Sequence, residues 1–523
     1  MFKITHRNEY KNNEKYINGD IIENDKIIDY SKKRKDIIGI LYCSSKVKLG
    51  ITKKNTIVYK FRPLDITLPI FQVSCKTISN SNKYAIVNFD SWNDILPKGA
   101  LVEILGNEND FETKKKAYQF LYCGRLKKYN LQNLIIPNKE IKNKEHNCIT
   151  IDPKGCQDID DGINLLLTDK HFNVSIYITD LIKKCGVLYE NNEKLQNKLL
   201  SYFNNNQPFT YYFDDKRYDC FPDNIVNYFS LFQGINHDCW CIDFKFNLDG
   251  DCINYEISQK NVYVTENLSY DEYKLSLEQI NILEKCFNKS QFKFEKKVST
   301  KSLIEFFAIY SNLLIGQFCN ENNILIPYRI QKDEISKTIH PKIKEIVERD
   351  YFDSAEYQFN SEIKHNYLDL KCYTHFTSPI RRKVDCYVHL MLYKYFNSNN
   401  KFTEDLSKVI NLECNLINNK EKQYKICCRE LTTIKFNKNN NILEYFWNKA
   451  IPKYCMKLNV GEQINKASFY FPLFQLTYVI KFIEDDHLKY YDITKKDDCI
   501  KFKLINNDIK LQNFSIKLYN KFI

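Results

Sequence analysis

The chain has 523 residues, of which 43% are hydrophobic and 14% aromatic, so it can bury a sizeable core and should form roughly three or four domains. The net charge of +12 is typical of proteins that bind nucleic acid, although a lysine-rich composition accounts for it equally well. The sequence has no signal-peptide pattern and no apolar run of the roughly 18 residues that span a membrane. We therefore expect an intracellular protein of a reducing compartment, nucleus or cytoplasm, with no membrane contact and with its 19 cysteines as thiols.

The first 144 residues divide into a polar beginning and a strand-rich part. Residues 1–34 are charged, with little periodicity, and are predicted to form an arm. From residue 35 to 144, turn-prone residues separate short apolar runs, which predicts strands close together in the sequence. These runs cover residues 37–43, 57–61, 70–73, 84–89 and 100–104. We expect a small OB-type barrel, a fold that binds single strands, although any small all-β domain has this pattern.

Residues 145–438 combine both kinds of periodicity and are predicted to form one mixed domain. Strand-like runs cover residues 149–151, 174–178, 241–246 and 259–264, and helical spacing covers residues 304–318 and 380–396. Residues 439–523 return to short β-like runs, at 476–482 and 500–504. The order of elements predicts a multidomain α/β (α+β) protein in which all-β barrels flank a central domain.

An acidic motif opens the central domain. It contains four aspartates within ten residues, Asp152, Asp158, Asp160 and Asp161. Pro153 and Gly155 break the strand at 149–151, so a loop can return the later carboxylates towards the first. Carboxylates that converge repel one another, and a divalent cation such as Mg²⁺, which prefers carboxylate oxygen, relieves that repulsion. The spacing therefore indicates a metal site.

Two other interpretations compete with a metal site in this motif. An acidic run is most often a solvated loop, but apolar residues at 149–151 and 163–167 flank this one and favour a loop held between strands. A calcium-binding EF-hand loop that started at Asp158 would place Ile163 where glycine is required, so that type of loop is excluded.

A second motif, further along the chain, combines a helix start with two arginines. Thr377 or Ser378 can cap a helix that begins there. Arg381 and Arg382 would then lie in the first turn, where free backbone amides already favour a phosphate. Asp385 lies four residues after Arg381, so an ion pair within the helix is the simpler interpretation. The two interpretations are compatible for different arginines.

Together the two motifs resemble the RNase II/RNase R (RNB) family, which includes the catalytic subunit of the eukaryotic exosome. The spacing of the four aspartates matches the first signature of that family, and His-Phe-Thr-Ser-Pro-Ile-Arg-Arg at residues 375–382 matches the second. Weaker matches include Tyr212 and the Tyr-Arg pair that ends at Arg329. The resemblance covers residues 35–435, and its pattern is closest to the exosome branch without the N-terminal endonuclease domain of that branch.

The resemblance implies a domain order. A cold-shock/OB-like RNA-binding domain is expected at residues 35–144, and an RNB catalytic domain at residues 145–438. Residues 439–523 lie where an S1-like β domain belongs, although they carry no clear S1 signature.

The resemblance also implies an activity. It is that of a hydrolytic 3′-to-5′ exoribonuclease that degrades single-stranded RNA to nucleoside 5′-monophosphates in RNA processing or decay. The four aspartates would hold two Mg²⁺ ions, for which Mn²⁺ can substitute, with Asp160 and Arg381 as catalytic residues. RNA would contact Tyr212, Arg329, His375 and Arg382. The alternative is an inactive RNA-binding scaffold of an RNA-decay complex. The resemblance also implies association with an exosome, an expectation that is weakened because no endonuclease domain is expected in this sequence.

Overall fold

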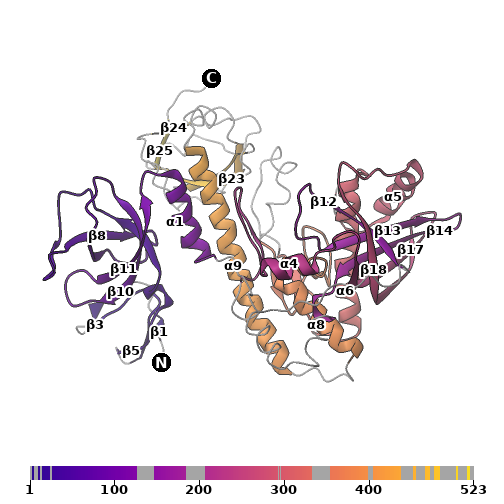
Figure 1. Cartoon of the computed structure of the whole chain (residues 1–523), viewed down its shortest axis with the longest axis horizontal. Helices are drawn as coiled ribbons and strands as arrows, with labels where there is room; N and C mark the ends of the chain where they lie inside the picture. The colour runs from indigo at the N-terminus through magenta and orange to yellow at the C-terminus, as the bar shows by residue number, and fades with distance from the viewer. Residues whose placement is uncertain are drawn as a thin grey trace, which may run out of the picture. The chain divides into compact units, whose positions relative to one another are not determined.

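A computed structural model describes most of the chain and divides it into two compact units (Figure 1). The described residues are 3–4, 10–11, 14–23, 26–126, 146–183, 207–292, 294, 296–332, 354–397, 404–437, 451–454, 466–471, 476–482, 502–504 and 515–518. Unit 1 contains Met1–Leu126 and Gln423–Lys449, and unit 2 contains Lys127–Lys422 and Ala450–Ile523. Each unit is described by itself.

Unit 1 begins with short strands where residues 1–34 were predicted to form an arm. Strands β1, β4 and β5 form one sheet and β2 pairs with β3. The strands are β1 (Lys3–Ile4), β2 (Tyr10–Lys11), β3 (Glu14–Lys15), β4 (Ile21–Glu23) and β5 (Lys26–Asp29), followed by the 3-10 turn η1 (Lys32–Arg34). The buried carboxylate of Asp20 accepts hydrogen bonds from the amides of Ile17 and Ser31, both at 2.8 Å, and pairs with Arg34 at 2.6 Å. This network ties residues 17–34 together, and the assignment of residues 1–34 as an arm stays a prediction.

A six-stranded sheet forms the core of unit 1. Its order is β6-β10-β11-β9-β8-β7, and an additional pairing of β6 with β8 joins its two sides. The strands are β6 (Ile37–Leu41), β7 (Gly50–Ile51), β8 (Ile57–Pro63), β9 (Phe71–Cys75), β10 (Lys83–Ser91) and β11 (Lys98–Asn107), followed by helix α1 (Phe111–Cys123). Tyr59 and Phe61 of β8 are buried with Phe71 and Val73 of β9, so alternate side chains line the interior. The five strand-like runs predicted from the sequence correspond to β6, β8, β9, β10 and β11.

A closed five-stranded barrel, in the order β12-β13-β14-β17-β18, forms the centre of unit 2. Its neighbouring strands pair antiparallel, except that β12 and β18 pair parallel. The strands are β12 (Asn147–Asp152), β13 (Asp161–Leu167), β14 (His171–Thr179), β17 (Asn236–Asn247) and β18 (Cys252–Ser269). The four strands predicted in this part of the sequence all lie within these elements.

Helices and two two-stranded sheets, β15-β16 and β19-β20, also belong to unit 2. They are β15 (Tyr211–Tyr212), β16 (Arg217–Tyr218), α4 (Asp223–Phe229), α5 (Leu277–Lys289), α6 (Thr300–Glu321), β19 (Tyr328–Ile330), β20 (Glu356–Gln358), α8 (Lys383–Asn397) and α9 (Glu404–Asn437), of which α9 continues into unit 1. Helix α6 packs on strand β17, where the ring of Phe307 lies 5.5 Å from that of Phe244 and 6.1 Å from that of Phe246.

Helix α6 is also the one described helix that is long and apolar enough to cross a membrane, although no such run was expected from the sequence. Its most apolar window is 67% buried inside the fold. That burial, together with the contacts to β17, is typical of the core helix of a folded domain.

The last part of the chain forms a five-stranded sheet in the order β21-β22-β23-β25-β24. Its strands are β21 (Ile451–Tyr454), β22 (Lys466–Phe471), β23 (Leu476–Phe482), β24 (Phe502–Leu504) and β25 (Ser515–Leu518). The run predicted at residues 476–482 is β23, and the run at 500–504 contains β24. The S1-like assignment of residues 439–523 stays a prediction.

Candidate active site

The four aspartates lie where strand β12 ends and strand β13 begins. Strand β12 ends at Asp152, and β13 begins at Asp161. Between them Gly155 has a φ of 82°, a conformation that favours glycine, and the amide of Cys156 donates to the carbonyl of Pro153 at 3.0 Å. The predicted break after Asp152 is confirmed, and the turn allows the chain to re-enter the barrel.

Three of these carboxyl groups are poorly solvated. Burial, followed by the charges of Asp161 and Asp158, raises the pKa of Asp152 to about 7. Burial also raises the pKa of Asp161 to about 6, and it raises the pKa of Asp160 well above its usual value. The charge of Arg381 opposes the last two shifts without cancelling them. The acidic motif therefore has too little positive charge nearby to offset the burial of these carboxyl groups.

Asp160 joins the acidic motif to the arginine motif. Its Oδ1 accepts a hydrogen bond from the backbone amide of Ile380 at 2.7 Å, and Nε of Arg381 lies 3.3 Å from its Oδ2. The Asp160 side chain is 3% exposed, whereas that of Arg381 is 45% exposed. The guanidinium of Arg381 therefore reaches from a buried carboxylate to solvent, and the two motifs form one site.

Helix α6 positions the chain that precedes Arg381. Oδ1 of Asn312 accepts hydrogen bonds from the amides of Phe376 at 2.7 Å and Thr377 at 3.3 Å. A Cβ atom added at Gly316 would lie 1.7 Å from the carbonyl oxygen of Cys372, so only glycine permits this close approach. Helix α6 thus holds the arginine motif through the side chain of Asn312 and through the close approach that Gly316 permits.

The helix after the arginine motif begins later than predicted. Helix α8 begins at Lys383, so Arg381 and Arg382 lie in the turn before it and not in its first turn. Asp385 stabilises that turn, because it accepts the amide of Ser378 at 2.7 Å and two bonds from Arg382 at 2.8 Å. The ion pair expected between Arg381 and Asp385 is also corrected, since Asp385 pairs with Arg382 instead.

Arg329 and His375, which were also predicted to contact RNA, form hydrogen bonds with protein side chains, as Arg382 does. Arg329 donates to Glu421 at 2.8 and 2.7 Å, and its side chain is 7% exposed. Nδ1 of His375 lies 2.7 Å from the hydroxyl of Tyr357, and burial, followed by the charges of Arg382 and Arg329, holds the pKa of His375 well below its usual value. RNA contact by these three residues stays a prediction.

Tyr212 lies beside the acidic motif. Its hydroxyl donates a hydrogen bond to Oδ2 of Asp158, while the residue is 45% exposed. Burial and the charge of Asp158 raise the pKa of Tyr212 above its usual value, so the hydroxyl remains a donor. An anchored hydroxyl and an accessible ring are compatible with the predicted stacking on a base.

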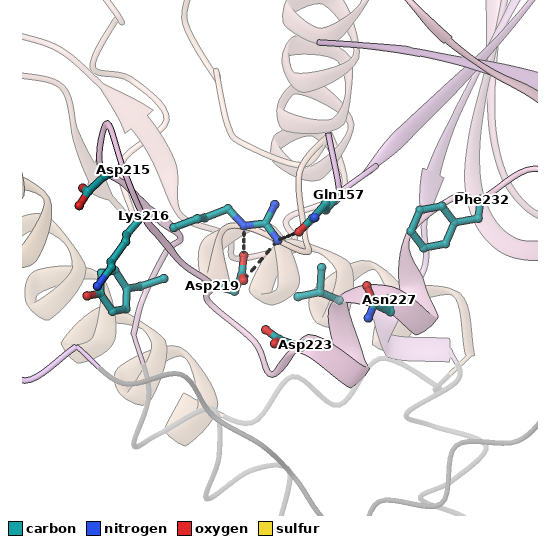
Figure 2. A pocket seen from close by; sticks show the side chains of 10 residues that line it. Gln157, Asp215, Lys216, Asp219, Asp223, Asn227 and Phe232 are labelled. Atoms are coloured by element: carbon teal, nitrogen blue, oxygen red, sulfur yellow. Dashed lines mark hydrogen bonds and ion pairs between the residues drawn. The ribbon is translucent and has the colours of Figure 1, made fainter. Parts of the chain in front are cut away.

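Arg217 and Asp219, in the same hairpin region, were not predicted as site residues. Nη1 of Arg217 donates to Oδ1 of Asp158 at 2.8 Å, and Nε lies 2.7 Å from Oδ1 of Asp219. Nη2 of Arg217 donates to Oε1 of Gln157 at 3.1 Å (Figure 2). The sequence offers no signal for these contacts, because Arg217 and Asp158 are 59 residues apart and the basic pair Lys216–Arg217 would usually be solvated.

A pocket of about 750 Å³ adjoins this ion pair (Figure 2). It is lined by Gln157 of the acidic loop, by hairpin residues that include Lys216, and by residues of α4 that include Asp223 and Asn227. Arg217 lines the same pocket while it bonds Asp158, so it connects the pocket to the acidic motif.

The donor chemistry of the acidic motif fits a divalent cation. Oδ2 of Asp152 is buried and has no hydrogen-bond partner in the described residues, and carboxylate oxygen is the ligand that Mg²⁺ prefers. Among the described side chains, no three His, Cys, Asp or Glu residues are already grouped around one metal position. Asp158 and Asp160 bond protein donors instead.

A comparison with known families identifies the chain. The sequence pattern of the family described as the RNB domain matches residues 139–289 and 274–398. The chain belongs to the RNB family. The human exosome complex exonuclease RRP44 is 22% identical to it over 270 residues, which are 47% of this chain and 27% of that protein. This RNB chain thus spans 27% of the length of that relative.

Solved structures share the fold of this RNB chain. RNase R of Mycoplasma genitalium, in complex with ribose-methylated single-stranded RNA, matches with a TM-score of 0.69 at 15% identity, over 96% of this chain and 95% of that one. Yeast Ssd1, described as a pseudonuclease, matches with a TM-score of 0.62 at 13% identity, over 91% of this chain and 68% of that one. The predicted fold class, a mixed α/β RNB fold with OB-type barrels, is confirmed.

Proposed function

We propose that this RNB chain is a metal-dependent, hydrolytic 3′-to-5′ exoribonuclease that degrades single-stranded RNA to nucleoside 5′-monophosphates in RNA processing or decay. The observation that carries the proposal is the bond from Ile380 to Asp160, which sets Arg381 beside Asp160 of the acidic motif. Membership in the RNB family supports a nuclease, and the likeness to an RNA-bound RNase R supports RNA as the substrate.

The four aspartates would hold the metal. Asp152, Asp158, Asp160 and Asp161 would bind two Mg²⁺ ions, or Mn²⁺ in their place, which when bound supply an activated water and charge at the leaving oxygen. Arg381 would neutralise the charge that develops on the phosphate, because its guanidinium is exposed next to Asp160. Tyr212 would stack on a base with its accessible ring.

A second candidate function is an RNA-binding scaffold without turnover. The fold likeness to Ssd1, a pseudonuclease, favours it, because an inactive protein can keep the architecture. The buried aspartates favour the enzyme. Like charges at low exposure destabilise the fold, and a scaffold has no need to retain all four of them.

Partners and location follow from the same proposal. Single-stranded RNA is the proposed partner. Association with an exosome is a further proposal that rests on the likeness to human RRP44. We place the protein in a reducing compartment, the nucleus or the cytoplasm, which agrees with the free thiols of the described cysteines.

The test uses 5′-labelled linear RNA and a circular RNA of the same sequence. With Mg²⁺ we expect the linear RNA to shorten from its unlabelled 3′ end and the circle to stay intact. A chelator should stop the reaction. Rapid cleavage of the circle would indicate an endonuclease, decay under chelation would exclude the metal mechanism, and binding without any decay would leave the scaffold.

A further inference from the structure

The β15–β16 hairpin holds both carboxylate oxygens of one aspartate. Tyr212 and Arg217 are direct cross-strand partners in this hairpin. The hydroxyl of Tyr212 donates to Oδ2 of Asp158, and Nη1 of Arg217 donates to Oδ1 at 2.8 Å. Because one residue of the pair takes each oxygen, the plane of the carboxylate is fixed by the hairpin.

Arg217 is itself fixed from three directions. Besides Asp158, its guanidinium contacts Asp219 at 2.7 Å and Gln157 at 3.1 Å (Figure 2). The side chains of Asp158 and Asp219 are 5% and 6% exposed, whereas that of Arg217 is 24% exposed. A planar guanidinium with donors in a rigid fork can make these contacts together, and a lysine ammonium cannot span them in the same way.

The same stretch of chain also contacts the arginine motif. The amide of Thr210 donates to the carbonyl of Arg381 at 2.9 Å, and the amide of Lys383 donates to the carbonyl of Pro208 at 3.0 Å. One hairpin therefore begins on the segment of Arg381 and ends on Asp158, so it can set the distance between the two motifs.

We infer that Arg217 is a positioning residue, which orients Asp158 towards the cation of the proposed function. The inference rests on that function, because Asp158 is one of the proposed metal ligands. A carboxylate has about four lone-pair sites, so the bonds from Tyr212 and Arg217 leave room for a cation. Partners that orient a metal ligand typically change metal affinity by about 10- to 100-fold when they are removed.

The experiment measures Mn²⁺ binding to the full chain without RNA, by electron paramagnetic resonance of the free ion. Four proteins are compared: wild type, Arg217→Gln, Arg217→Lys and Lys216→Gln. Lys216→Gln is the matched control, because it removes the same charge one position away. Among the described side chains, Tyr212 and Arg217 bond Asp158 and Lys216 does not. Single-turnover rates and the KM for RNA are measured on the same proteins.

We expect Arg217→Gln to weaken Mn²⁺ binding by about tenfold or more and to lower kcat, with the KM for RNA unchanged. Arg217→Lys should lie between it and wild type, because a lysine restores charge without the fork. It also carries the test if the glutamine variant does not fold. Lys216→Gln should bind Mn²⁺ as wild type does.

Unchanged or tighter Mn²⁺ binding in Arg217→Gln would overturn the inference, and tighter binding would mean that Arg217 competes with the cation. An equal loss in Lys216→Gln would also overturn it, since the effect would then be one of net charge. If wild type binds no Mn²⁺, the metal centre of the proposed function fails and the role of Arg217 fails with it. The two failures are distinguishable, because in the other case wild type binds Mn²⁺ and Arg217→Gln binds it equally well.

Discussion

The backbone amide of Ile380 donates a hydrogen bond to Oδ1 of Asp160 at 2.7 Å, although the two residues are 220 positions apart in the chain. This bond uses one oxygen of the carboxylate and leaves the other 3.3 Å from Nε of Arg381. The position of Arg381 therefore depends on Asp160 of the acidic motif. Substitutions in the two motifs should show which side chains affect stability and which affect the rate of RNA cleavage.

The two adjacent arginines should respond differently to removal. Arg381→Met takes away an exposed guanidinium and should lower kcat about a hundredfold or more, with a smaller loss of thermal stability than Arg382→Met, because Arg381 contacts Asp160 at 3.3 Å whereas Arg382 makes two bonds at 2.8 Å. Arg382→Met leaves the buried Asp385 without its ion pair, which typically costs about 3–5 kcal/mol. Thermal unfolding and single-turnover rates on both variants measure the difference. An equal fall in Tm for the two variants would contradict these assignments.

Arg329 should matter for stability. Its guanidinium makes two bonds to Glu421 and is 7% exposed, so Arg329→Met should lower the free energy of unfolding by about 3 kcal/mol. Urea unfolding measures this loss. The Kd for RNA, measured at a temperature where the variant is folded, then tests the predicted RNA contact of Arg329. An unchanged Kd would exclude that contact, and an unchanged stability would contradict the structural role.

His389 should make stability depend on pH. Its ring is fully buried, with Nε2 2.9 Å from the carbonyl of Phe376, and burial lowers the pKa of His389 from 6.5 to about 4. The unfolded chain binds a proton near pH 6.5 and the folded chain does not. Stability is therefore fully present above that pH and falls as the pH drops towards about 4, by on the order of 3 kcal/mol.

The control for this effect is His389→Gln, which keeps an N–H donor for the Phe376 carbonyl and does not titrate. Urea unfolding of both proteins at pH 7 and pH 4.5 gives the comparison. Between pH 7 and pH 4.5, the free energy of unfolding should fall more for wild type than for His389→Gln. A difference that is the same at both pH values would show that His389 does not carry this dependence.

Local patterns predicted much of the fold, because alternation of apolar residues depends only on near neighbours. The runs at residues 57–61 and 84–89 became strands β8 and β10 for that reason. The acidic motif was equally visible, since its aspartates lie within ten residues. Contacts across long stretches of sequence were not. Arg217 meets Asp158 across 59 residues and Arg329 meets Glu421 across 92, and no local pattern encodes either pair.

The start of helix α8 shows how tertiary contacts override a local rule. Ser378 and the proline after it satisfy the usual signals of a helix start. In the fold, Asp385 bonds both the amide of Ser378 and the side chain of Arg382, and these bonds stabilise a turn that lasts until Lys383. The sequence therefore located the motif correctly but not its backbone conformation.

The central claim is that the aspartates perform metal-dependent chemistry on RNA, and Asp160→Asn tests it most directly. An asparagine keeps an oxygen that can accept the amide of Ile380 and removes one negative charge, so the site should retain its shape. The measurement is the single-turnover rate and the Kd on 5′-labelled single-stranded RNA with Mg²⁺, for wild type and variant. We predict that the rate falls by orders of magnitude, since about 1.4 kcal/mol is tenfold, while the Kd is unchanged or lower because phosphate and stacking contacts lie elsewhere. A variant that degrades RNA at the wild-type rate would contradict the role of Asp160, and a wild type that binds RNA and leaves its 3′ end intact would contradict the enzyme itself.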